Sequence, residues 1–189
     1  MTMEGAGDAP FIAERIAEWA AALTPAEIPD AVWLKAKSAV LDVAGLSVSA
    51  RQADYVTSIK SAFPETGLCT VFGHAEGLSA AGAACVNGTA AHGEDFDDTY
   101  EGTPVHVGAV AVPAVLAICQ ENGRSGVDLL KGIVVTGEIA CRMAVVQPTA
   151  QHRAGFHPTS VIGTIAAAAG VAVALGLDAP RIVNAMGTA

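Results

Sequence analysis

The sequence predicts an all-α fold, on three observations. Apolar residues recur every three or four positions through most of the chain, which is the period of a helix face. The composition is 52% hydrophobic but only 5% aromatic, so the core must consist of small aliphatic side chains that let helices approach closely. Capping residues and Gly or Pro breakers separate the periodic segments. We expect about seven helices in a single domain over residues 1–189, with residues 1–10 as a flexible tail.

The first helices are predicted from periodicity and proline placement. Residues Phe11–Leu23 carry apolar side chains at helical spacing, with glutamates on the opposite face. Residues 24–27, Thr-Pro-Ala-Glu, have the form of a capping box with proline at the first helical position and predict a short turn. A longer helix is expected over Asp30–Val48.

The next segment is less regular. The pattern over residues 51–63 is only weakly helical, and residues 64–67 form a breaker. The β-prone run Cys69–Phe72 predicts one brief strand. Ser79 can then cap an Ala-rich helix that continues to about His92.

The second half of the chain predicts longer apolar helices. A helix over Val107–Glu121 contains Pro113, which removes one backbone donor and is expected to bend or restart it. Residues 125–128 form a capping box that opens a helix to about Val146, and Pro148 ends it.

Two final helices complete the pattern. Thr159 is expected to cap a helix over Ser160–Leu175, and Gly176 supplies its C-terminal signal. Asp178 begins a last helix in which the sequence stops, so we expect this chain to be part of a longer one.

Composition narrows the classes of function. Ten Lys and Arg against 19 Asp and Glu give a net charge of -9, which opposes binding to nucleic acid and to anionic membranes. The cysteines show no CxxC pair and are expected to be reduced, mostly buried thiols; they are Cys69, Cys85, Cys119 and Cys141. The first ten residues lack the features of a signal peptide, so we expect a cytoplasmic protein.

Two stretches raise the question of a membrane span. Val107–Cys119 is shorter than the ~20 apolar residues that a spanning helix needs, and Val161–Leu177 approaches that length only with Ala and Gly. These small residues suit packing between helices better than contact with lipid. We therefore expect no membrane association.

The densest polar cluster lies at residues 92–99, His-Gly-Glu-Asp-Phe-Asp-Asp-Thr, followed by His106 across a Gly/Pro loop. If the preceding helix continues, Asp95 and Thr99 share one face and Asp97 points elsewhere. A plain alternative is a solvated helix end, although negative charge is unfavourable at a helix C-terminus.

Two further interpretations of this region stay open. His92, Asp95, Asp98 and His106 could converge on a divalent metal ion, but no fixed ligand signature is present and we expect none to be bound. At residues 152–159, His157 precedes a helix start, where backbone donors favour an anion such as a substrate carboxylate. His157 could equally make only a local hydrogen bond.

Arg142 lies in a hydrophobic helix four residues after Glu138. It could clamp a substrate, or it could form a buried structural ion pair with Glu138. The structural role is preferred here.

These polar segments resemble the MmgE/PrpD family. The matching blocks are Asp-Phe-Asp-Asp-Thr at 95–99, His-Val-Gly at 106–108 and Gly-Phe-His-Pro-Thr at 155–159, in the family's order. The resemblance runs from about Phe11 to the end of the chain. It implies the N-terminal part of a large helical domain, with the family's smaller α/β domain absent, and a homodimer.

The resemblance also implies a function. Family members include 2-methylcitrate dehydratase, cis-aconitate decarboxylase and iminodisuccinate epimerase, which act on small polycarboxylates without metal or organic cofactor. By resemblance, Asp95, Thr99, His106 and His157 match active-site positions. Family members also carry active-site lysines further along the chain than residue 189.

The favoured hypothesis is a lyase that moves a proton at a carbon next to a carboxylate, with a dehydratase preferred. His106 and His157 would act as acid/base or carboxylate-binding groups, Asp95 would orient one of them, and Thr99 would hydrogen-bond substrate. The alternatives are the family's decarboxylase or epimerase activity, or a helical oligomerisation module without turnover.

Overall fold

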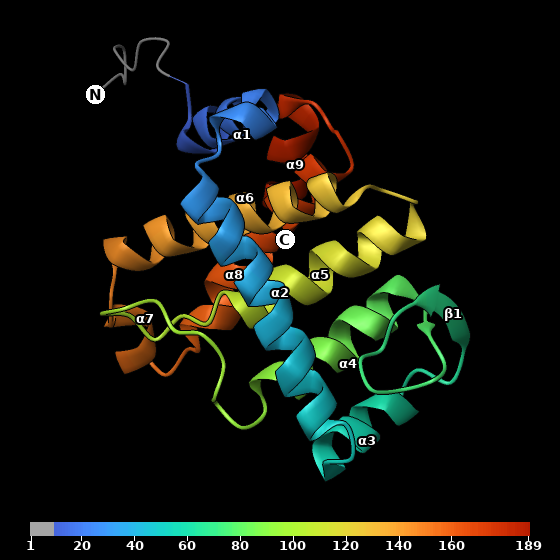
Figure 1. The fold of residues 1–189 in the computed structure, drawn as a ribbon. Coiled ribbons are helices and arrows are strands. Elements are labelled where there is room, and N and C mark those ends of the chain that lie inside the picture. The colour runs from blue at the N-terminus through green and yellow to red at the C-terminus, as the bar shows by residue number, and fades with distance from the viewer. Residues whose placement is uncertain (1–9) are drawn as a thin grey trace.

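The computed structural model describes residues 10–189 and confirms the all-α class. Within these residues it contains nine α-helices, a short 3-10 turn and one short strand (Figure 1). The predicted tail at residues 1–10 lies, except for Pro10, outside the described residues. The helices are α1 Ile12–Ala22, α2 Asp30–Ala50, α3 Asp54–Ser61, α4 Ala80–His92, α5 Gly108–Glu121, α6 Gly126–Val146, α7 Ala150–Arg153, α8 Pro158–Ala174 and α9 Ala179–Thr188; the 3-10 turn is Pro25–Glu27, and the strand, β1, is Thr66–Cys69.

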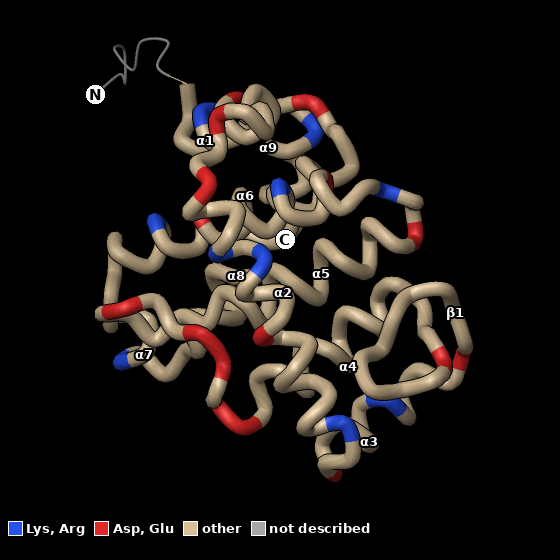
Figure 2. The backbone as a smooth tube through the Cα atoms, in the orientation of Figure 1, with Lys and Arg blue, Asp and Glu red and all other residues tan. Residues whose placement is uncertain are grey.

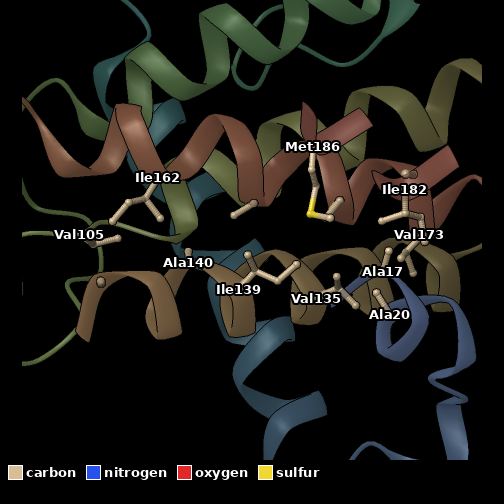
Figure 3. Close-up of a cluster of buried hydrophobic side chains, with 14 residues drawn as sticks. Ala17, Ala20, Val105, Val135, Ile139, Ala140, Ile162, Val173, Ile182 and Met186 are labelled. Atoms are coloured by element: carbon tan, nitrogen blue, oxygen red, sulfur yellow. The ribbon is translucent and has the colours of Figure 1, made fainter. Parts of the chain in front are cut away.

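The helices pack around α5, α6 and α8, which lie at the centre of the molecule. Helix α2 crosses this centre and contacts α4, α5 and α6 (Figure 1). Helices α1 and α9 cover one end, whereas α3, α4 and β1 form the other. Figure 3 shows the core between α1, α6, α8 and α9, where Ile139, Ile162 and Ile182 meet alanines of the same cluster.

Helices α6 and α8 approach each other closely at two glycines. A Cβ atom added to Gly170 would lie 2.5 Å from the carbonyl oxygen of Gly132 and 2.0 Å from the hydroxyl of Thr136. A Cβ atom added to Gly132 would lie 2.8 Å from the carbonyl oxygen of Gly170. The expectation that small residues bring the helices together is therefore confirmed at this crossing.

Local capping signals predicted several helix ends correctly. The Ser79 hydroxyl accepts a hydrogen bond from the Gly82 backbone N–H at the start of α4. Ser125 and Asp128 form the predicted reciprocal capping box at the start of α6. Asp178 accepts from the Arg181 N–H at the start of α9. Each signal is local, so tertiary packing does not override it.

The strand begins and ends earlier than predicted. The Asn87 amide oxygen accepts a hydrogen bond from the Phe72 N–H at 2.9 Å, and its amide nitrogen donates to the Thr70 carbonyl at 2.8 Å. Because this buried side chain occupies the backbone groups of residues 70 and 72, they cannot pair with another strand. Within the described residues, β1 pairs with Leu78 and its Gly67 N–H donates to the Gly77 carbonyl at 2.9 Å.

Two other expectations need correction. Helix α5 passes through Pro113 as a single helix, so of the two predicted outcomes, a bend or a restart, the restart is excluded. The Glu138–Arg142 pair forms as predicted, but both side chains are exposed and the pair is not buried. Because exposed ion pairs contribute little to stability, we expect this pair to add less than about 1 kcal/mol to the free energy of unfolding.

Two further expectations concern the burial of the cysteines and the absence of a membrane-spanning helix. All four cysteines are free, but only Cys69 and Cys119 are buried, and Cys85 is exposed. Burial raises the pKa of the Cys69 and Cys119 thiols above the ordinary value. Among residues 10–189, no helix combines the length and the apolar character that crossing a membrane requires.

Candidate functional site

Three histidines meet at one end of the bundle, where α4 ends and α5 and α8 begin. His92 is the last residue of α4, His106 precedes α5, and His157 is the N-cap residue of α8. The ring centroids of His92 and His106 are 4.7 Å apart, and those of His92 and His157 are 5.2 Å apart. Residues far apart in the sequence therefore form one imidazole cluster.

The loop between α4 and α5 turns sharply at Asp95, which has a positive φ of 57°. Asp tolerates this left-handed conformation better than most residues do. The helix does not continue past His92, so the predicted shared face of Asp95 and Thr99 is wrong. The turn leaves Asp95 exposed and carries Asp97 to the interior.

Asp97 is the buried acceptor of the cluster, with its side chain fully inaccessible to solvent. Its Oδ1 atom lies 3.0 Å from Nδ1 of His92 and 3.2 Å from Nδ1 of His106. Its Oδ2 atom also lies 3.0 Å from the His92 Nδ1 atom. A buried carboxylate needs such partners because desolvation is otherwise costly.

His106 is held on several sides. Its Nε2 atom lies 3.4 Å from Oδ1 of Asp95, whose side chain is 78% exposed. The Thr99 hydroxyl lies 3.5 Å from the His106 Nδ1 atom, at the outer limit of a hydrogen bond. The His106 backbone N–H donates to the Thr159 hydroxyl at 3.0 Å. The ring is therefore fixed in place, with Asp95 at its solvent side.

Thr159 was predicted to cap α8, but it does not. Helix α8 begins at Pro158, so Thr159 lies inside its first turn. Its buried hydroxyl accepts from the His106 N–H and approaches the Pro104 carbonyl at 3.4 Å, which ties the loop to α8. This tertiary hydrogen bond places His106 beside His157.

His157 is the exposed member of the cluster. Its Nε2 atom lies 3.1 Å from Nε2 of His92. Partial desolvation of the ring has the largest effect and lowers the pKa of the His157 imidazole below its ordinary value of 6.5. The neighbouring His92 and His106 lower this pKa further, whereas the Asp95 carboxylate raises it. A neutral imidazole at this position can accept a proton near neutral pH.

The candidate metal ligands converge only in part. His92, Asp95 and His106 come together, and their ligand atoms and one of Asp97 all lie within 4.8 Å of one another. Asp98 does not join them, because its Oδ1 atom accepts from the Gly108 N–H at 2.7 Å at the start of α5. Two imidazoles and two carboxylates are a donor set that suits a divalent ion such as Zn²⁺.

A cavity of about 270 Å³ opens on the other side of this loop, between α2, α5 and α6. Thr99, Tyr100 and Lys35 line it, together with small apolar side chains such as Ala36 and Ala111. The histidines do not line it, so Thr99 lies at the boundary between the cavity and the imidazole cluster. Figure 2 shows acidic residues along the loop between α4 and α5.

All four residues predicted as site residues lie at this cluster: Asp95, Thr99, His106 and His157. The sequence did not predict that Asp97 is the buried hydrogen-bond acceptor, or that the Thr159 hydroxyl joins the loop to α8. His92 was considered only as a metal ligand. The five-residue spacing of His92 and Asp97 gave no signal, because their contact depends on the turn at Asp95.

Comparison with known proteins matches residues 14–189 to the MmgE/PrpD N-terminal domain. A cis-aconitate decarboxylase of Aspergillus terreus is 29% identical over 188 residues, which cover 94% of this chain and 38% of that protein. The human cis-aconitate decarboxylase is 35% identical over 112 residues, covering 57% of this chain and 23% of that protein. The mouse protein of that name is 29% identical over 171 residues, covering 86% of this chain and 35% of its own length. The chain thus spans well under half the length of these relatives.

Proposed function

The chain belongs to the MmgE/PrpD family through its N-terminal domain, and from this premise we propose that the protein is a lyase that acts on a small polycarboxylate. The observation that carries the proposal is the convergence of His106, His157, Asp95 and Thr99 from separate segments. Such a group of neutral and charged donors and acceptors suits proton transfer at a carbon next to a carboxylate.

The specific reaction favoured by the named relatives is decarboxylation of cis-aconitate. In this reaction one C–C bond breaks, CO₂ leaves, and the electron pair stays on the neighbouring carbon, where the double bond delocalises it. A proton from the protein then forms a C–H bond at the resulting allylic anion and gives a five-carbon dicarboxylate. The reaction needs one acid near the carbon and donors that hold the remaining carboxylates.

The imidazoles can meet these needs. His157 is exposed and reaches the solvent side of the cluster, so it is placed to exchange a proton with a bound substrate. His106 lies between the carboxylates of Asp95 and Asp97, at 3.4 Å from Nε2 and 3.2 Å from Nδ1. The Thr99 hydroxyl lies beside the His106 ring and can hydrogen-bond a substrate carboxylate.

The dehydratase preference drawn from the sequence has no specific observation in its favour and stays a prediction, as does the epimerase. An oligomerisation module without turnover also stays an alternative for this chain by itself. We further propose a cytoplasmic homodimer that works without a cofactor, as the family resemblance implies, and that binds neither nucleic acid nor membranes, given a net charge of -9.

The proposal is tested on the natively produced protein. Its intact mass would first be compared with the 19.0 kDa of this chain, followed by turnover assays with cis-aconitate, citrate and 2-methylcitrate. We expect cis-aconitate to release CO₂ and, in D₂O, to give a product with one solvent deuterium on carbon. Citrate or 2-methylcitrate dehydration without CO₂ release would favour the dehydratase, and no turnover of any substrate would contradict the lyase proposal.

The role of His157 is tested by His157→Ala in the same protein. Loss of a group that transfers a proton lowers turnover by about 10²- to 10⁴-fold, so we expect at least a hundredfold decrease. Glu101→Gln is the matched control, because Glu101 is an exposed residue of the loop between α4 and α5. Unchanged kinetics of His157→Ala would refute this role.

A further inference from the structure

His92, His157 and Asp97 form a continuous chain of hydrogen-bonding atoms. It runs from the buried Asp97 carboxylate to Nδ1 of His92 at 3.0 Å, and from Nε2 of His92 to Nε2 of His157 at 3.1 Å. His106 lies beside this chain, with Nδ1 3.2 Å from Asp97 Oδ1 and 3.5 Å from the Thr99 hydroxyl, its hydrogen-bonding partner. The inner end is inaccessible to solvent and the outer end is exposed, so the chain connects the interior to the surface.

The chemistry of each group fixes the positions of the protons. An ionised Asp97 only accepts, so His92 carries a proton on Nδ1. A neutral His92 then has an unprotonated Nε2 atom, which can only accept from the Nε2–H group of His157. A neutral His157 consequently has its free lone pair on Nδ1. One buried carboxylate thus determines the tautomers of His92 and His157.

We infer that Asp97 and His92 are positioning residues that form the inner part of a proton relay, with His157 as its outer member. This inference rests on the proposed function, in which His157 exchanges a proton with the substrate. The relay explains why a buried carboxylate and a third histidine lie behind the imidazoles predicted from the sequence.

The relay step conserves protons and charge. When His157 accepts a proton at Nδ1, its Nε2 proton passes to Nε2 of His92. His157 thus forms one N–H bond and breaks another, whereas His92 forms one N–H bond and keeps its Nδ1–H bond. His92 becomes an imidazolium ion next to the Asp97 carboxylate, and His157 stays neutral. The reverse movement delivers a proton to a substrate carbanion. Storing the positive charge beside a buried carboxylate stabilises it, as in other Asp–His pairs.

Histidine NMR tests the inference without requiring turnover. On the ¹⁵N-labelled natively produced protein at about pH 8, above the ordinary imidazole pKa, we expect the Nδ1–H tautomer for His92 and the Nε2–H tautomer for His157. In Asp97→Ala no carboxylate remains to accept from the His92 Nδ1–H group, so His92 should lose its preference for this tautomer. Glu101→Gln should change none. A proton on Nδ1 of His157 with none on Nδ1 of His92, or an unchanged His92 tautomer in Asp97→Ala, would overturn the relay.

Kinetics separate the relay from the proposed function. His92→Gln retains a polar side chain at a partly buried position, and we expect kcat to fall about tenfold or more while KM changes little, because the ring lies behind His157. If His157→Ala lowers turnover and His92→Gln leaves kcat unchanged, the relay is wrong and the proposed function stands. If the wild-type protein turns over no polycarboxylate, the proposed function fails, and the NMR tautomers still decide whether Asp97 sets the ring protonation.

Discussion

The protonation state of His157 sets the pH range in which the site can accept a proton. Burial and the neighbouring imidazoles lower its pKa below 6.5, so the ring remains neutral as the pH falls to 6.5 and becomes protonated only below it. For a reaction in which His157 accepts the substrate proton, such as dehydration, kcat/KM should fall on the acid side at this lowered pKa. Decarboxylation, in which the protein donates the proton, should instead lose activity as the pH rises through the same pKa. The measurement is an NMR titration of the His157 ring together with a pH profile of kcat/KM. A His157 midpoint at or above 6.5 would contradict the burial argument.

Metal dependence can be decided at the same residues. We propose that the reaction needs no metal, so extensive treatment with EDTA should leave turnover unchanged. Added Zn²⁺ should inhibit, because His92, Asp95, Asp97 and His106 offer ligand atoms within 4.8 Å of one another. Inhibition should be reversed by the chelator and weakened in Asp95→Asn. Loss of turnover with EDTA that Zn²⁺ or Mn²⁺ restores would instead favour the metal interpretation left open by the sequence.

At the residue scale, the sequence allowed the polar residues of the site to be predicted but not their roles. Asp95, Thr99, His106 and His157 stand in recognisable blocks, whereas the burial of Asp97 depends on the left-handed turn at Asp95. No periodicity encodes a single residue with positive φ. The hydroxyl of Thr159 was likewise assigned to a local cap, because its acceptor role for His106 joins residues 53 positions apart.

At the element scale, the crossing of α6 and α8 is the contact on which the core depends most directly. Gly170→Ala would place a methyl group 2.5 Å from the Gly132 carbonyl oxygen, a backbone atom that cannot move without displacing α6. We expect a loss of about 1–3 kcal/mol in the free energy of unfolding, as for overpacking elsewhere. Denaturant unfolding followed by circular dichroism measures it.

Gly45→Ala provides the matched control for this prediction. Gly45 lies in the middle of α2, is exposed, and has no atom within 4 Å of an added Cβ. Because Ala has the higher helix propensity, this variant should be more stable by up to about 1 kcal/mol. If both variants change stability by the same amount and sign, the close crossing is not what makes Gly170 necessary.

Helix boundaries were predictable where a short-range hydrogen bond determines them and less so elsewhere. The caps at Ser79 and Ser125 act within four residues, so the sequence contains the whole signal. Helix α7 was not predicted, because its four residues are too few to show a period. The displaced strand depends on Asn87, whose partners lie 15 and 17 residues away.

At the scale of the whole molecule, α2 is apolar on two faces. Ala36 and Val43 are buried against the bundle, whereas Leu34, Leu41 and Val48 are exposed by 66%, 76% and 42%. The exposed side chains recur every seven residues and so form one stripe along the helix. Large apolar side chains exposed along one face of a helix are a feature of interaction sites. It is a natural surface for the homodimer that the family resemblance implies.

If α2 forms the dimer contact, Leu41→Glu should convert the natively produced protein from dimer to monomer, because it places a charge at the centre of the apolar stripe. Sedimentation velocity measures the oligomeric state, and thermal melting checks that the fold is retained. The control is Leu68→Glu, since Leu68 is 89% exposed on β1, away from the α2 stripe. A Leu41→Glu variant that stays dimeric would exclude α2 as the interface. A monomeric wild-type protein would refute the homodimer itself and leave the stripe to be covered by another part of the protein.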